Sequence, residues 1–584
     1  MTCGIKLSMN VNLICVALSD EGAASLDRKF RSAVKKVESL IPSPESHTFE
    51  KPFIRAYNSN RVSGTWTVPP CFESGDSLIS FSQPPIPNGD EFSSAKNYWD
   101  LISRVVSKGE FERLQPNYFG FEVRGDGEVK VWSDILGLGR CYYVLNDNFL
   151  AASNHIGALT EFVDGRLKVD EGAVAKFAGA GFFMNNDSPI VGVSRLAEAE
   201  VLEVGHDRRV KQSQYQQLSD LFQPVESDQA YTAAIEQLAI VSHNITRMVD
   251  KTPSVFLSGG RDSRMTAGIW LAQGNPANVI TMGALPREAE IATELMEIFF
   301  DEKSSSASVQ HKITFPQPRD ITMSLDDRLG TAFALWDGDA APTNMKRNVT
   351  VPSGRAVVQI GGAGGEITHG YYYPRPRQIE KLAESADPIE SAKRSFGINT
   401  LTSFASRHID EAFEFVAEKA DKAGLSGLGR LDYIYLSEKF RRWVNQALGS
   451  TSAVLLAAPA FVNLAFNVSP EDKVAKRIPV ELVKRSIPAW GEVETYKAAG
   501  DDSKRLMRQG TCTYQTDPAG FWERWEESQQ WQQFLNPEVL GNYCELVRSD
   551  EASPVHESWM NRAIWIDEIY RHVEQLNAER SEGA

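Results

Sequence analysis

Short segments in which apolar and polar residues alternate dominate the first 210 or so residues of the chain. Several of them flank turn sequences, such as Gly125-Asp126-Gly127 and Gly205-His206-Asp207. Alternation with a period of two predicts strands, and a short glycine- or asparagine-rich turn between two strands predicts a hairpin. The predicted strands cover 118–123, 128–132, 141–145, 149–152, 200–204 and 208–212. Repeated hairpins with few helices indicate stacked antiparallel sheets.

From about Asp228 the pattern changes to helical periods that alternate with short apolar runs. The predicted elements are helix 231–248, strand 254–257, helix 264–272, strand 279–282 and helix 288–300. This alternation is typical of a parallel sheet with crossover helices. Because the polar segment 214–228 separates the two patterns, we predict one domain over 1–213 and a second over 226–584.

Beyond residue 380 the chain is predicted to be mostly helical. Two stripes of large apolar residues have helical spacing, and such stripes usually pack in a core. They comprise Trp522, Trp525, Trp531 and Phe534 in one, and Trp559, Ala563, Ile566 and Tyr570 in the other.

Residues 254–264 predict a buried strand, a glycine turn and a helix start. Gly259 and Gly260 allow backbone N–H groups to converge on phosphate oxygens, and the hydroxyls of Ser258 and Ser263 add donors at the helix N-terminus. Asp262 is placed to hold Mg²⁺ against the same phosphates. No lysine follows the glycines, so this is not the phosphate loop of kinases and GTPases. The alternative to a pyrophosphate site is a tight corner between strand and helix.

Composition and charge argue against several classes of protein. The chain has 584 residues, 42% of them hydrophobic, and a net charge of −16. It has no lysine- or arginine-rich block, which argues against a nucleic-acid partner. Six scattered cysteines are typical of reduced thiols in a cytoplasmic protein. The start alternates apolar and polar residues and predicts a strand, so we expect neither a signal peptide nor a membrane span.

The stretch Ser258–Ser263 also resembles the loop of enzymes that split ATP into AMP and pyrophosphate. Together with Met1-Thr2-Cys3-Gly4-Ile5, Ser133 to Gly137 and Tyr142-Tyr143, it makes the chain similar to the asparagine synthetase family, which includes β-lactam synthetases and lasso-peptide cyclases. The resemblance implies an α/β and α+β architecture. An N-terminal Ntn-hydrolase-like sandwich would be followed by an adenine-nucleotide α-hydrolase-like (PP-loop) parallel-sheet domain with a helical C-terminal part.

Residues 359–366 resemble the family's second phosphate-side loop. The resemblance implies that Glu366 replaces its magnesium-binding aspartate, and that Asp262 and Glu366 bind one Mg²⁺. The implied ATP and pyrophosphate contacts are Leu257, Ser258, Gly259, Gly260, Arg261, Asp262, Ser263, Met282, Gly361, Gly362 and Gly364. Met282 ends the strand next to the first loop, where ligands of parallel sheets bind, and its backbone is expected to meet adenine. The glycine cluster is otherwise a plain loop.

The family also uses a catalytic lysine that stabilises charge during amide formation. Lys497 stands near the corresponding spacing after Ile487-Pro488, with Lys484 and Lys504 as competitors. A lone lysine is otherwise a solvated surface group.

Several positions depart from the family pattern. The family's glutaminase nucleophile is a cysteine exposed by loss of Met1, whereas here Thr2 would be exposed and Cys3 is one place late. We therefore expect Thr2 and Cys3 to mark a vestigial glutaminase site. Ala363 replaces a glutamate, and the segment 455–462 is apolar where the family has charges, which favours a larger or less polar acceptor.

Other polar residues near the loops keep two interpretations. Arg261 and Arg264 either contact phosphates or lie on a helix surface. His369 and the tyrosines at 371–373 either line the acceptor pocket or pack as a lid. Asp337 and Asp339 resemble a metal pair, but an Asp-Gly-Asp turn is more often a solvated loop, and we interpret them as a solvated turn.

The sequence thus predicts an AMP-forming ligase with ATP and Mg²⁺ as cofactors. It would adenylate a small-molecule or peptide carboxylate and form an amide with ammonia or an amine. Intramolecular amide closure and an ATP-binding scaffold without chemistry are the alternatives. The resemblance also suggests a homodimer.

Overall fold

The computed structural model describes residues 10–40, 43, 45–60, 65–283, 285–302, 308–315, 323–346, 357–373, 388–395, 397–446, 451–496, 513–549 and 551–582. The predictions for Met1 to Ile5, including Thr2 and Cys3, and for Lys497 and Lys504 lie outside these residues.

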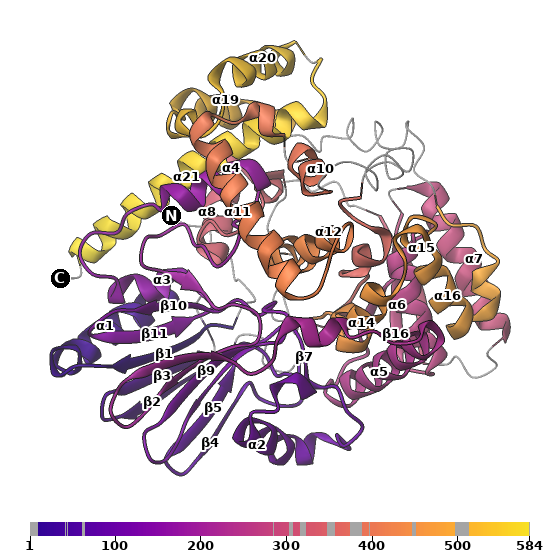
Figure 1. The fold of residues 1–584 in the computed structure, drawn as a ribbon, viewed down its shortest axis with the longest axis horizontal. Helices are drawn as coiled ribbons and strands as arrows, with labels where there is room; N and C mark the ends of the chain where they lie inside the picture. Colours follow the sequence, from indigo (N-terminus) through magenta and orange to yellow (C-terminus); the bar gives the residue numbers. More distant parts are fainter. Residues whose placement is uncertain are drawn as a thin grey trace.

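Two six-stranded antiparallel sheets form the N-terminal part (Figure 1). One has the order β12-β10-β11-β1-β3-β2 and the other β14-β13-β9-β8-β5-β4. The first contains β1 (Asn12–Ala17), β2 (Ser46–Lys51), β3 (Ile54–Ser59), β10 (Tyr142–Leu145), β11 (Phe149–Ser153) and β12 (Ser194–Arg195). The second contains β4 (Cys71–Ser74), β5 (Ser77–Phe81), β8 (Phe119–Val123), β9 (Val129–Ser133), β13 (Glu200–Val204) and β14 (Val210–Gln214). The predicted hairpins are confirmed, with ends that differ by a few residues.

Alternation along β1 explains why this strand is buried on both faces. Ile14 and Val16 point into the core between the two sheets, where Phe121 and Leu202 meet them. Leu13, Cys15 and Ala17 instead pack with helix α1 (Asp20–Leu40) on the other face. The first sheet is therefore the middle layer, with a helix on one side and the second sheet on the other.

A five-stranded parallel sheet follows, in the order β17-β16-β15-β18-β19. Its strands are β15 (Ser254–Phe256), β16 (Ala277–Met282), β17 (Val309–Thr314), β18 (Gln359–Ile360) and β19 (Ser452–Ala453). Helices α5 (Ser227–Arg247), α6 (Arg261–Ala272) and α7 (Pro286–Glu302) alternate with the first strands. The predicted parallel sheet with crossover helices is confirmed.

The rest of the described chain is mostly helical, as predicted. The longer helices are α8 (Leu325–Trp336), α11 (Ser403–Lys422), α14 (Pro459–Asn467), α16 (Arg477–Ser486), α19 (Pro518–Glu527), α20 (Pro537–Arg548) and α21 (Pro554–Glu582). Figure 1 shows α21 running back from this part past α4 (Glu171–Ala180) toward the sandwich. Trp531 and Phe534 of the first aromatic stripe and Ala563 and Ile566 of the second are buried, which confirms their core role.

A buried ion network joins the sandwich to the later part of the chain. Asp339 Oδ2 lies 2.6 Å from Arg442 Nη1 and 3.9 Å from Arg195 Nη1, and all three side chains are at most 3% exposed. Asp337 accepts hydrogen bonds from the backbone N–H groups of Ile156 and Gly157. The interpretation of Asp337 and Asp339 as a solvated turn is therefore wrong. Helix α8 carries them into the junction, where arginines and backbone donors replace water.

Candidate active site at the two glycine loops

The first glycine loop leaves β15 and enters helix α6, which begins at Arg261. Ser263 Oγ accepts a hydrogen bond from Ser258 N at 3.0 Å, and the two serine hydroxyls lie 2.8 Å apart. Gly260 N donates to Ser258 Oγ at 3.1 Å. The two serines predicted as phosphate donors thus fold the loop upon itself at the start of the helix, where the helix dipole favours anions.

The second loop follows β18, which pairs with β15 in parallel, so both loops leave the sheet at the same edge. The loops are in contact. A methyl group on Gly362 would lie 2.6 Å from the backbone carbon of Asp262, and one on Gly365 would lie 2.5 Å from Cγ of Asp262. Only glycine allows this approach. Gly364 has a φ of +95°, and Gly361 is the least crowded of the four. Gly365, at the closest contact, was not among the predicted site residues.

The two predicted metal-binding carboxylates lie on these two loops. Glu366 Oε2 accepts hydrogen bonds from the Tyr435 hydroxyl at 2.7 Å and from Gly364 N at 3.1 Å. Burial raises the pKa of Glu366, and the negative charge of Asp262 raises it further. Asp262 Oδ1 lies 2.5 Å from Nε2 of His369. Each carboxylate therefore lies in the field of the other, and each already has a hydrogen-bonding partner.

The pair fits a magnesium ion that is shared with phosphate. Among the described residues, no group of three or more His, Cys, Asp or Glu side chains is arranged to hold a metal by itself. Mg²⁺ in nucleotide sites is usually held by one or two carboxylates, with phosphate oxygens and water completing the octahedron. A bound cation would favour the charged form of Glu366, whose pKa is raised by burial and by the charge of Asp262.

Arg264 has neither of the roles predicted for it. It is 3% exposed, and its guanidinium donates to the carbonyls of Val493 and Glu494, both at 2.8 Å. It therefore ties helix α6 to the 490–496 segment and is unavailable to phosphate. Arg261 is partly exposed, with Nη2 3.5 Å from Thr495 Oγ1.

Lys476 lies near the first loop, and sequence reasoning did not single it out. Its Nζ donates to the His369 carbonyl at 2.8 Å. Burial lowers its pKa, the positive charge of Arg261 lowers it further, and Asp262 raises it. Lys476 thus lies in the electrostatic field of the first loop. No spacing or motif in the sequence marks this residue, because it reaches the loop from a different segment. Lys484, one of the predicted competitors, is 46% exposed and pairs with Glu492 on the surface.

Met282, predicted to contact adenine, and the tyrosines predicted to line the acceptor pocket differ in exposure and in bonding partners. Met282 is 49% exposed at the end of β16, and Phe315 lies against the neighbouring Gly283. Tyr371 is 48% exposed, and its ring centroid is 5.1 Å from that of Tyr435. Tyr373 instead donates to the buried Asp432, so it has a structural role.

No protein-family model and no curated protein sequence matches the chain. Two solved structures show partial likeness. The glutamine phosphoribosylpyrophosphate amidotransferase of B. subtilis, complexed with ADP and GMP, is 12% identical, with a TM-score of 0.20 over 52% of this chain and 81% of its own. A second structure, described as the allosteric regulatory enzyme of purine biosynthesis, is 11% identical, with a TM-score of 0.19 over 52% of this chain and 80% of its own. TM-scores this low carry no argument, so the assignment of the sandwich and the parallel sheet rests on this chain's own strand pairing.

Proposed function

We propose that the chain is an AMP-forming carbon–nitrogen ligase with a PP-loop nucleotide site at residues 257–263. The contact between the two glycine loops carries this proposal. Gly362 and Gly365 bring the second loop onto Asp262 at a helix N-terminus, and Glu366, the next residue, is near enough for the charge of Asp262 to raise its pKa. That combination suits Mg²⁺ bound to a polyphosphate.

Each residue has a role in this reaction. Asp262 and Glu366 would hold Mg²⁺, which neutralises phosphate charge when bound. The loop N–H groups and the Ser258 and Ser263 hydroxyls would bind pyrophosphate. Arg261 and Lys476 supply positive charge near the loop, and Lys497 stays the proposed catalytic lysine.

The proposed chemistry has two steps. A substrate carboxylate oxygen attacks the α-phosphorus of ATP, and the bond to the bridging oxygen breaks to release pyrophosphate. An amine then attacks the acyl carbon, the carbon–nitrogen bond forms, and AMP leaves with the former carboxylate oxygen. Holding the partners in line supplies much of the rate, since the adenylate is already an activated acyl donor.

Labelled ATP tests this proposal. With a panel of carboxylates and ammonium, the wild-type protein should form AMP and pyrophosphate. Asp262→Asn should lose this activity about 100-fold or more, as expected when a group that positions reacting phosphates is removed. Asp250→Asn, on the surface of the same part of the chain, should behave as wild type. Formation of ADP, or full activity of Asp262→Asn, would refute the proposal.

Intramolecular amide closure is a second candidate, because the segment 455–462 is apolar and largely buried. A cyclase should form AMP without added ammonium or glutamine, whereas an ammonia-dependent ligase should not. Tight ATP binding with no pyrophosphate exchange for any carboxylate would instead favour the scaffold.

Glutaminase activity is a separate question. We propose that the site around Thr2 and Cys3 is inactive. Robust ammonia release from glutamine by protein with a sequenced N-terminus would contradict this.

A further inference from the structure

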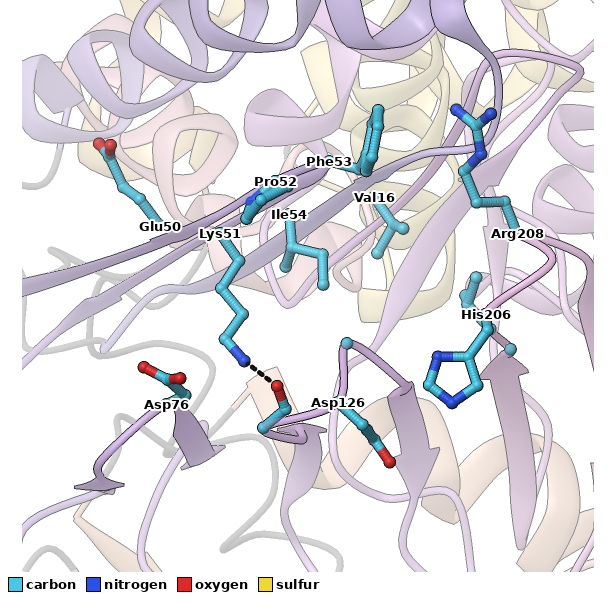
Figure 2. Close-up of a pocket in the computed structure, with 14 residues that line it drawn as sticks. Val16, Glu50, Lys51, Pro52, Phe53, Ile54, Asp76, Asp126, His206 and Arg208 are labelled. Carbon is cyan, nitrogen blue, oxygen red and sulfur yellow. Dashed lines mark hydrogen bonds between the residues drawn. The ribbon is translucent and has the colours of Figure 1, made fainter.

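A cavity of about 520 Å³ opens at one end of the sandwich, where hairpin turns from both sheets meet (Figure 2). The turn between β2 and β3 borders it on one side. The turns β4–β5, β8–β9 and β13–β14 border it on the other. None of the residues that line it belongs to the two glycine loops. We call this cavity the hairpin mouth. Its volume is in the range of small-molecule sites.

Two contacts between the sheets hold the hairpin mouth in shape. Lys51 Nζ crosses from the first sheet and donates to the carbonyls of Arg124 at 3.0 Å and Gly125 at 2.7 Å, and Figure 2 draws the second of these bonds. The Arg208 guanidinium, from the second sheet, lies 4.8 Å from the ring centroid of Phe53. The mouth is therefore fixed in place before any ligand binds, which reduces the entropy cost of binding.

Backbone strain is concentrated at one of these contacts. Phe53 has a φ of +64° and Arg208 a φ of +59°, in the left-handed region that side chains other than glycine and asparagine rarely occupy. Each costs about 1–2 kcal/mol. These two residues, which face each other across the rim, are strained together. Such strain clusters at functional sites, where it holds a defined geometry.

The lining combines an apolar floor with a polar rim. Val16, Ile54 and Val204 form the floor, and each is 3% exposed because the core between the sheets ends there. Asp76 on the rim makes no hydrogen bond or ion pair within the part of the chain that the structure describes. The His206 side chain is 62% exposed, with Nε2 3.7 Å from Glu128.

The rim charges nearly cancel. Glu50, Asp76 and Asp126 supply three carboxylates, and Lys51 and Arg208 supply two cations. Both cations already have partners: Lys51 the two carbonyls, and Arg208 the Phe53 ring and Asp20. A charged ligand would gain little from such a balanced rim. A neutral ligand with many hydroxyls can use the carboxylates as acceptors and His206 as a partner, and can pack C–H groups against the exposed part of the Phe53 ring.

We propose that the hairpin mouth is a binding site for a neutral carbohydrate. This inference does not rest on the proposed ligase activity, because the two sites share no residue.

Isothermal titration of the full chain with glucose, galactose, N-acetylglucosamine and maltose tests the proposal, with spermidine and citrate as charged comparators. At least one sugar should bind with a Kd of about 1 mM or tighter. The double variant Asp76→Asn/Asp126→Asn should weaken that binding about ten-fold or more, since hydrogen bonds to charged groups are the stronger ones. Asp147→Asn, on a hairpin turn outside the mouth, should leave it unchanged.

Both variant positions lie on turns, and asparagine keeps an oxygen that can accept the Glu128 N–H bond made by Asp126, so the fold should survive. Equal melting temperatures would verify this. The proposal is overturned if none of the four sugars binds, if the double variant binds sugar as tightly as wild type, or if spermidine or citrate displaces the sugar.

Discussion

A methyl group at Gly365 should weaken Mg²⁺-dependent ATP binding far more than a methyl group at Gly361. In Gly365→Ala the new carbon would lie 2.5 Å from Cγ and 2.7 Å from Oδ1 of Asp262. Non-bonded carbons normally stay about 3.5–4.0 Å apart. The Asp262 carboxylate must therefore move by about 1 Å, either directly or by displacement of the whole loop.

The size of the effect follows from this clash. Forcing one additional methyl group into a packed site costs about 1–3 kcal/mol. In the free variant Asp262 can relieve the clash by turning away. Because Mg²⁺ and ATP require its original position, the clash must be restored on binding and its free energy is subtracted from the free energy of binding. ATP affinity in the presence of Mg²⁺ should then fall about 5- to 150-fold, at about 1.4 kcal/mol for each factor of ten.

Gly361→Ala is the matched control, because the nearest atom to its new methyl group would be Phe256 Cδ2 at 4.0 Å. Isothermal titration with α,β-methylene-ATP, with and without Mg²⁺, measures both variants without a known acceptor. Gly365→Ala should lose most of the increase in nucleotide affinity that Mg²⁺ provides, and Gly361→Ala should keep that increase. Equal Mg²⁺-dependent affinity in both variants would refute the packing of the second loop against Asp262.

Three further predictions concern the first loop, the buried Lys439 and the junction. Ser263→Ala removes the hydroxyl that accepts from Ser258 N and also bonds to the Ser258 hydroxyl. The loss of these two hydrogen bonds, about 1 kcal/mol each, should weaken ATP binding up to about 30-fold in a titration. Unchanged affinity would contradict the loop geometry. Burial lowers the pKa of Lys439 to about 8, so the folded protein carries a desolvated charge below that pH. In the unfolded chain Lys439 keeps its proton up to about pH 10.4, so the free energy of unfolding should rise between about pH 8 and that pH. Lys439→Met should therefore raise the free energy of unfolding by roughly 1–3 kcal/mol at pH 7 and by little at pH 10.5, as measured by urea unfolding. Asp339→Asn removes the carboxylate that pairs with the buried Arg442 and Arg195, and should cost about 3–5 kcal/mol in the same assay. A loss below 1 kcal/mol would show that water reaches the junction.

Local pattern was sufficient for several elements of this protein, although it did not predict helix α1 (Asp20–Leu40). Alternation around Gly125–Gly127 and Gly205–Asp207 predicted the hairpins β8–β9 and β13–β14, because a period of two and a short turn are properties of the chain itself. The switch to helical periods after Asp228 likewise predicted the parallel sheet. The first loop could be recognised from the sequence because its glycines, serines and aspartate lie within six residues of one another.

Long-range packing decided what the pattern left open. Arg264 and Asp339 were both interpreted as partly solvated, yet one caps the 490–496 segment and the other compensates arginines that lie far away in sequence. Neither role leaves a local trace, because the partners arrive only when the segments pack.

The sequence by itself therefore determined the hairpins, the parallel strands and the glycine turn that leads from β15 into helix α6. The tertiary structure alone decided that Gly365 touches Asp262, that Tyr435 holds Glu366, and that Lys476 lies near the first loop. The physical reason is that periodicity and turn propensity act between neighbours along the chain, whereas close approach, desolvation and charge compensation act between groups that only folding brings together.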